Sequence, residues 1–151
     1  MKDQIGGGGF ASVPRTRSRN PVTVLKTVVL AIRQEPRRYS QETYGEPAYE
    51  FYGSRRRLPE CGTVGCVALW SLIVTRDEKD TVRRVSYGEV GWHARLRLGL
   101  TDEQAMHLFD GGAVQRIADS YRPGTKRYVE AGVRHIERFM RQHLGYKGPK
   151  L

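Results

Sequence analysis

The chain has 151 residues, the usual size of one domain and enough to bury a hydrophobic core without metal or disulfide support. Its 26 lysines and arginines outnumber 16 aspartates and glutamates, and the resulting net charge of +10 favours nucleic acid, nucleoprotein or a protein with an acidic surface as partner. The sequence shows no apolar run of membrane-spanning length, no secretory signal and only two cysteines, so we expect a soluble cytoplasmic protein without a membrane partner.

Residues 1–19 are predicted to form a flexible basic arm. Four consecutive glycines, Gly6 to Gly9, are followed by arginines on alternate positions, and the segment offers no apolar face to bury. The glycine run lacks the Gly-Lys-Ser/Thr ending of a phosphate loop, so we interpret it as a linker. A helical domain over residues 20–146 and a short tail over residues 147–151 complete the predicted organisation.

The first predicted helix begins at a clear start signal. Asn20 is a favoured N-cap residue, and Pro21 suits the first helical position. The apolar side chains that follow recur at i, i+3, i+4 and i+7, in Leu25, Val28, Val29 and Ile32. We expect a core helix that ends before Pro36.

Arg37 to Glu60 is predicted to be a long loop, because proline, glycine and serine punctuate it. Its arginines interleave with aromatic residues, a combination that can neutralise phosphates and stack on unpaired bases or on a protein partner. The alternative is that the tyrosines pack the loop onto the helices while the arginines are solvated. The candidate binding residues in this loop are Arg37, Arg38, Tyr39, Tyr52, Arg55, Arg56 and Arg57.

Thr63 to Val74 is apolar on every side, which predicts a helix buried in the centre of the domain with Trp70 inside it. A buried strand is the alternative, since valine, leucine and isoleucine are common in strands. The run exceeds ordinary strand length and therefore favours the helix.

The two cysteines stand at the start of this run. Four residues separate Cys61 from Cys66, and five helical steps would point their side chains about 140° apart, which does not suit a shared metal ion. Cys61 is also a candidate nucleophile, because a helix beginning at Thr63 would lower its pKa, with His93 or His107 as base. We interpret the cysteines instead as small core residues, and expect no catalytic residue, bound metal or cofactor.

Two blocks of the sequence resemble a known family. Cys61 to Trp70 reads Cys-Gly-Thr-Val-Gly-Cys-Val-Ala-Leu-Trp, and a second block reads Leu-Gly-Leu-Thr-Asp-Glu-Gln-Ala from Leu98 to Ala105. The first resembles the Cys-Gly-Thr-x-x-Cys-x-Ala-Gly-Trp signature of small proteins of high-GC bacteria and their phages, except that Leu69 replaces the usual glycine. The resemblance spans about residues 22–140. It implies a fold rather than a reaction, and a phage-type accessory or inhibitory role.

Further helices are predicted downstream. Tyr87 to Leu98 should form a weaker helix that Gly99 stops. Thr101 and Gln104 form a capping-box pattern that starts the next helix, and this helix should end at Asp110. The apolar positions of the following helix are Val114, Ile117, Ala118 and Tyr121.

The helices before and after Asp110-Gly111-Gly112 have the length and glycine turn of a helix-turn-helix. In that interpretation the second helix presents Gln115, Arg116, Asp119 and Ser120 to a DNA groove, with Arg122 at its end. Arg116 is therefore a candidate binding residue. The alternative is an ordinary corner between two helices.

A long last helix is predicted to begin after Thr125 and to close at Gly145. Its buried stripe should consist of Val129, Val133, Ile136, Met140 and Leu144. The spacing i, i+4 predicts ion pairs from Glu130 to Arg134 and from Glu137 to Arg141, which would satisfy much of the charge of this helix internally.

The sequence therefore predicts an all-α protein, a single compact bundle of five or six helices with a long Arg/Tyr-rich loop. The function that we favour is a non-catalytic basic interaction protein for nucleic acid or a nucleoprotein machine. A thiol- or metal-dependent enzyme centred on Cys61 and a helix-turn-helix regulator using Arg116 are the alternatives.

Overall fold

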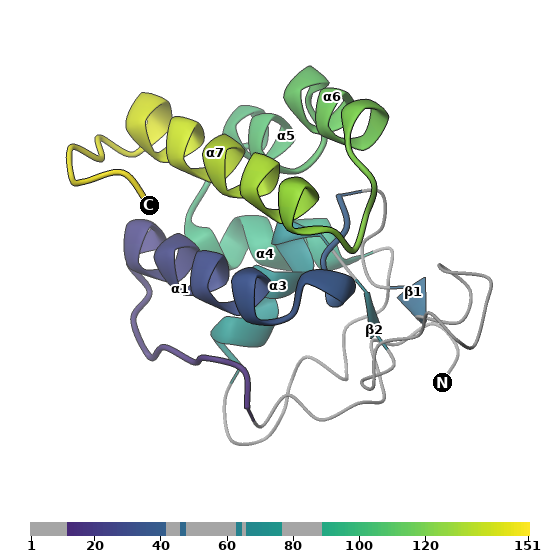
Figure 1. Cartoon of the computed structure of the whole chain (residues 1–151). Coiled ribbons are helices and arrows are strands. Elements are labelled where there is room, and N and C mark those ends of the chain that lie inside the picture. Colours follow the sequence, from purple (N-terminus) through teal and green to yellow (C-terminus); the bar gives the residue numbers. More distant parts are fainter. Residues whose placement is uncertain (1–11, 42–45, 48–62, 65, 77–88) are drawn as a thin grey trace.

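The computed structural model of the chain describes residues 12–41, 46–47, 63–64, 66–76 and 89–151, and over these residues the protein is an all-α bundle, as predicted. Figure 1 shows α1, α3 and α4 on one side of the molecule and α5, α6 and α7 on the other, with α7 lying alongside α1. The elements are α1 (Pro21–Gln34), the 3₁₀ turn η1 (Pro36–Arg38), β1 (Glu46–Pro47), β2 (Thr63–Val64), α3 (Val67–Val74), α4 (Val90–Leu98), α5 (Asp102–Phe109), α6 (Gly112–Ser120) and α7 (Lys126–His143).

Helix α1 begins and ends where the sequence predicts. The side chain of Asn20 accepts hydrogen bonds from the backbone N–H groups of Val22 and Thr23 at 3.0 and 3.3 Å, and so satisfies two of the donors at the helix start. The four predicted apolar positions are buried, and Pro36 begins the short η1 turn after the helix has ended.

Helix α3 is the buried centre of the fold, because every residue from Val67 to Val74 is buried. It packs against α1 and α4 (Figure 1). Its predicted start at Thr63 is wrong, because Thr63 and Val64 form an antiparallel ladder with Glu46 and Pro47. The β-branched side chains of this pair favour extended backbone, and Gly65 disfavours a helix that would continue through it.

The predicted arm departs from expectation over residues 12–19, which lie against the domain. Val13 is buried in the core, and the N–H of Thr16 donates to the carbonyl of Val74 at 2.8 Å. This segment therefore covers the end of α3.

The capping patterns of the C-terminal half are confirmed. Thr101 and Gln104 each accept a hydrogen bond from the other's backbone N–H, at 3.1 and 3.0 Å, and Thr125 accepts from the N–H of Tyr128 at 3.2 Å. Gly145 adopts a left-handed φ of 66° after α7, a conformation that favours glycine. The apolar stripe of α7 faces the core as predicted, with Leu144 partly buried at its end.

None of the described helices combines the length and the apolar character needed to cross a membrane.

Replacing Trp70 by alanine should reduce the free energy of unfolding by about 3–5 kcal/mol, because its ring fills the centre of the core. Its indole N–H also donates to the carbonyl of Arg38 at 3.3 Å. The matched control is Trp92→Ala, since Trp92 is 57% exposed and its loss should cost about 0.5 kcal/mol or less. Urea denaturation of both variants tests this. A Trp70→Ala protein whose thermal midpoint stays within about one degree of wild type would contradict the central position of α3.

Gly132→Ala should destabilise the protein by about 1–3 kcal/mol, since the new methyl group would overpack a filled space. A Cβ at Gly132 would lie 2.7 Å from two ring atoms of the buried Tyr39, and closer still to its hydroxyl. Gly112→Ala serves as the control, because the nearest atom to its Cβ would be an Arg116 nitrogen at an ordinary 3.6 Å. Equal unfolding free energies for the two variants would show that α7 can move away from Tyr39.

Candidate nucleic-acid interface

Three arginines form a stripe along the solvent side of α7. Arg127, Arg134 and Arg138 are spaced by seven and four residues, which places them on one side of a helix. All three are exposed, whereas Val133 and Ile136 on the opposite side are buried. The amphipathic pattern that docks α7 onto the core therefore also directs these cations outward.

The pairing predicted between Glu130 and Arg134 is replaced by a pair between helices. Nε and Nη2 of Arg33, on α1, donate to the two carboxylate oxygens of Glu130, both at 2.9 Å. These hydrogen bonds are the main reason why the pKa of Glu130 is lowered and the pKa of Arg33 is raised. A two-pronged guanidinium contact from the neighbouring helix is geometrically superior to a single contact along α7, so Arg134 forms no ion pair with a described acid.

The second predicted pair is confirmed. Nε of Arg141 lies 3.3 Å from a carboxylate oxygen of Glu137. Glu137 also accepts a hydrogen bond from the N–H of Leu151 at 2.9 Å, which is the main cause that lowers the pKa of its carboxyl group.

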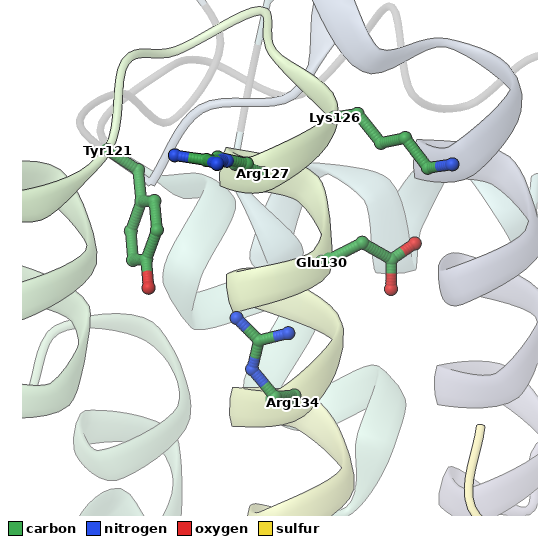
Figure 2. A pocket seen from close by; sticks show the side chains of 5 residues that line it. All are labelled: Tyr121, Lys126, Arg127, Glu130 and Arg134. Carbon is green, nitrogen blue, oxygen red and sulfur yellow. The ribbon is translucent and has the colours of Figure 1, made fainter.

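A cavity of about 400 Å³ lies beside the first half of the arginine stripe. Figure 2 shows Tyr121, Arg127 and Arg134 gathered on one side of α7, whereas Lys126 and Glu130 extend from its other side toward α1. Glu130 is the one acid among these five lining residues, and Arg33 already neutralises it. The electrostatic character of the cavity is therefore cationic, with a tyrosine ring as one wall.

A second cavity of about 350 Å³ lies between the α5–α6 turn and the C-terminal half of α7. Arg116 from α6 and Arg138 from α7 both line it, together with His107, His143 and backbone of the glycine turn. The rings of His107 and His143 lie with centroids 5.3 Å apart, and the His143 ring lies 4.9 Å from that of Phe139. Its lining residues include no acid.

His135 forms the floor of this second cavity and is almost fully buried. Its Nε2 lies 3.0 Å from the carbonyl oxygen of Leu108, and because a carbonyl can only accept, Nε2 must carry the proton. Burial lowers the pKa of His135, so the neutral ring is the form that the fold favours.

The two helices of the predicted helix-turn-helix are α5 and α6, and an ordinary corner between helices would have the same two elements. Both helices form, and Arg116 is exposed on α6 as expected. However, the first two positions of α6 are Gly112 and Ala113, preceded by Gly111, and none of these residues has a side chain that can form a hydrogen bond with a base edge. Gln115 meanwhile donates to Asp119 at 2.9 Å. Helix α6 thus contributes charge rather than an evident base-reading surface.

Two of the loop residues predicted to bind a partner are core residues. Arg38 is 1% exposed, with its guanidinium 5.6 Å from the centroid of the Trp70 ring. Tyr39 is completely buried, edge-on to the ring of Tyr128 at 5.4 Å. Both side chains turn inward, because the apolar stem of Arg38 packs beside Trp70 of α3 and the ring of Tyr39 fills space at Gly132 of α7. Arg37 remains exposed, and Tyr52, Arg55, Arg56 and Arg57 lie outside the described residues.

Cys66 is a buried core residue, as predicted, although the helix beside it begins later than expected. The helix that was predicted to begin at Thr63 begins at Val67, so Cys66 rather than Cys61 stands at its N-cap position. Cys66 is buried, and burial raises its pKa to about 11, which keeps the thiol protonated near neutral pH. Cys61 lies outside the described part of the chain. Within that part, no group of three or more histidine, cysteine or acidic residues is arranged to hold a metal ion.

We call Arg116 on α6 and Arg127, Arg134 and Arg138 on α7 the basic face. Sequence reasoning predicted Arg116 as a binding residue but missed the three arginines of α7. The spacing of the α7 arginines opposite the apolar stripe was a visible signal. The i, i+4 spacing hides this signal, because it predicts that Glu130 neutralises Arg134.

No protein-family model, curated protein or solved structure matches the chain.

The buried neutral histidine predicts an acid sensitivity with a definite sign. Because the pKa of His135 is lowered in the fold, the unfolded chain binds more protons at mildly acidic pH. Its contribution to stability is therefore complete above the unfolded pKa of about 6.5 and is lost as pH falls through the lower folded value. Urea denaturation of wild type and of His135→Gln, at about pH 7.5 and about pH 5, should show a smaller pH-dependent loss in the variant. An equal loss would contradict the buried neutral state of this ring.

Proposed function

We propose that this chain is a non-catalytic nucleic-acid-binding protein that holds phosphate groups on its basic face. The observation that carries the proposal is the set of four exposed arginines, on two adjacent helices, that form no ion pair with a described acid. Exposed guanidinium groups without an acidic neighbour gain most from a polyanion, because binding releases the counterions condensed on it.

The dimensions of the stripe suit such a partner. Helix α7 rises about 16 Å between Arg127 and Arg138, a length over which duplex DNA presents about ten phosphates. The two cavities lie along this stripe, with Arg134 lining the first and Arg138, one turn later, lining the second. A backbone laid along α7 would meet a guanidinium group near each cavity.

Contacts of this kind position a nucleic acid without reading its sequence. The lack of hydrogen-bonding side chains at the first two positions of α6 supports this non-specific mode over the sequence-specific regulator. The thiol-enzyme alternative is centred on Cys61, which lies outside the described residues, so the buried Cys66 does not bear on it. The resemblance to phage proteins motivates a further proposal, that the partner is a nucleic acid held within a nucleoprotein machine. The chain would act on that machine in the cytoplasm as an accessory or inhibitory protein.

The test compares variants of equal charge. Replacing Arg127, Arg134 and Arg138 by glutamine should flatten the slope of log K against log salt for a short oligonucleotide by about 2–3, since each lost phosphate contact changes it by about 0.7–0.9. The matched control replaces three exposed cations elsewhere, Arg15, Arg17 and Lys150, and should change the slope by less than about 1. A third variant, with Arg55, Arg56 and Arg57 replaced, measures the contribution of the predicted loop.

Circular dichroism of each variant should show that the helices persist. Equal slope changes in the first two variants would mean that only net charge matters. If wild type fails to bind oligonucleotides even at low salt, the nucleic-acid proposal is wrong and an acidic protein surface becomes the candidate partner.

A further inference from the structure

The cavity between the α5–α6 turn and α7 has the composition of an anion site. Arg116 and Arg138 approach it from two different helices, and His107, Gln142 and His143 add further polar groups. An Arg116 nitrogen lies 3.6 Å from the position that a Cβ on Gly112 would occupy, so its guanidinium group folds back over the start of α6. That start has no side-chain cap, which leaves the first amides of α6 beside the two arginines.

The chemistry favours an anion with several oxygens. A guanidinium group is planar and donates in parallel pairs, so two of them from opposite walls suit a tetrahedral phosphate better than a single halide or a carboxylate. No acidic side chain lines the cavity to oppose the charge. Its volume of about 350 Å³ is in the range of small-molecule sites, and leaves room for more than the phosphate alone.

We propose that this cavity binds a phosphomonoester, either the terminal phosphate of a nucleic-acid strand or the phosphate of a free mononucleotide. A terminal phosphate carries up to two negative charges and has three free oxygens. An internal phosphodiester carries one negative charge and has two free oxygens. The paired arginines, with the donors around them, therefore match the terminal group better. This inference deepens the proposed function, because a strand whose end lies in the cavity can continue from Arg138 to Arg134 along the basic face.

The experiment measures discrimination between strand ends. Fluorescence anisotropy of the full chain with single-stranded oligonucleotides of one sequence, bearing a 5′-phosphate, a 3′-phosphate or only hydroxyl ends, should show tighter binding of at least one phosphorylated form by about tenfold. Arg116→Gln and Arg138→Gln should each reduce this ratio toward one. The matched control is Arg134→Gln, on the same stripe but outside the cavity, which should weaken all three oligonucleotides and keep the ratio.

A second arm separates the two sources of the phosphate. Adenosine monophosphate, with adenosine as control, should compete with the phosphorylated oligonucleotide if the cavity also accepts a free nucleotide. If adenosine monophosphate does not compete while the end preference persists, the ligand is a strand end.

The two proposals fail in different ways. Equal binding of all three oligonucleotides by wild type overturns the phosphomonoester site and leaves the basic face intact. If no oligonucleotide binds, an NMR titration with adenosine monophosphate decides. Shifts of the Gly111 and Gly112 amides that Arg116→Gln abolishes would support the cavity and refute the nucleic-acid function, and their absence would refute both.

Discussion

The burial of α3 on every side is the constraint on which the other elements depend. A helix without a polar face must be covered all round, and α1, α4, α5 and the segment before α1 provide that cover. Burial also removes water from the end of the helix, so its last carbonyl groups need donors from the protein. Arginines supply several of them. Arg76 donates to the carbonyl of Ile73 at 2.7 Å, and Arg97 donates to that of Thr75 at 3.1 Å. Cations at this position also complement the negative end of the helix dipole.

The positive charge of the chain consequently divides into two populations. One population is structural: it includes Arg76 and Arg97 at the end of α3, and Arg33 in its fork with Glu130. The other population includes the basic face, whose four arginines form no ion pair with a described acid. A net charge of +10 alone does not separate these populations, because it counts a half-buried arginine that caps a helix and an exposed surface arginine equally. The basic face can bind a polyanion without breaking the contacts of the first population.

The sequence predicted those features that neighbouring residues determine. The start of α1 at Asn20, the capping box at Thr101 and the glycine at 145 depend on atoms a few residues apart, and local chemistry suffices for each. It failed where distant segments compete. Thr63 pairs with Pro47 instead of extending α3, and Glu130 prefers Arg33, 97 residues away, to its neighbour on α7. The inward turn of Arg38 was likewise invisible, since arginine is ordinarily a surface residue and only the tertiary packing provides the Trp70 ring beside it. The cavity at the glycine turn was not predictable for the same reason. Arg116 and Arg138 line one cavity only because α6 packs on α7.

The side of α7 on which its acids lie explains why the arginine stripe itself carries no acid. By the 3.6-residue period, Glu130 and Glu137 project from the same flank of the helix, about 60–80° from the arginine stripe. That flank faces α1 and the C-terminal residues, where Arg33 and the N–H of Leu151 engage the two carboxylates. The opposite flank faces α6, and there α7 contributes no acid. Arg138 thus lines a cavity without an acid, and Arg134 lines one whose single acid, Glu130, is paired with Arg33. Both acids of α7 meanwhile stabilise the contacts that hold the helix in place. The packing of α7 and the polarity of its exposed surface are two consequences of one arrangement of charges along a single helix.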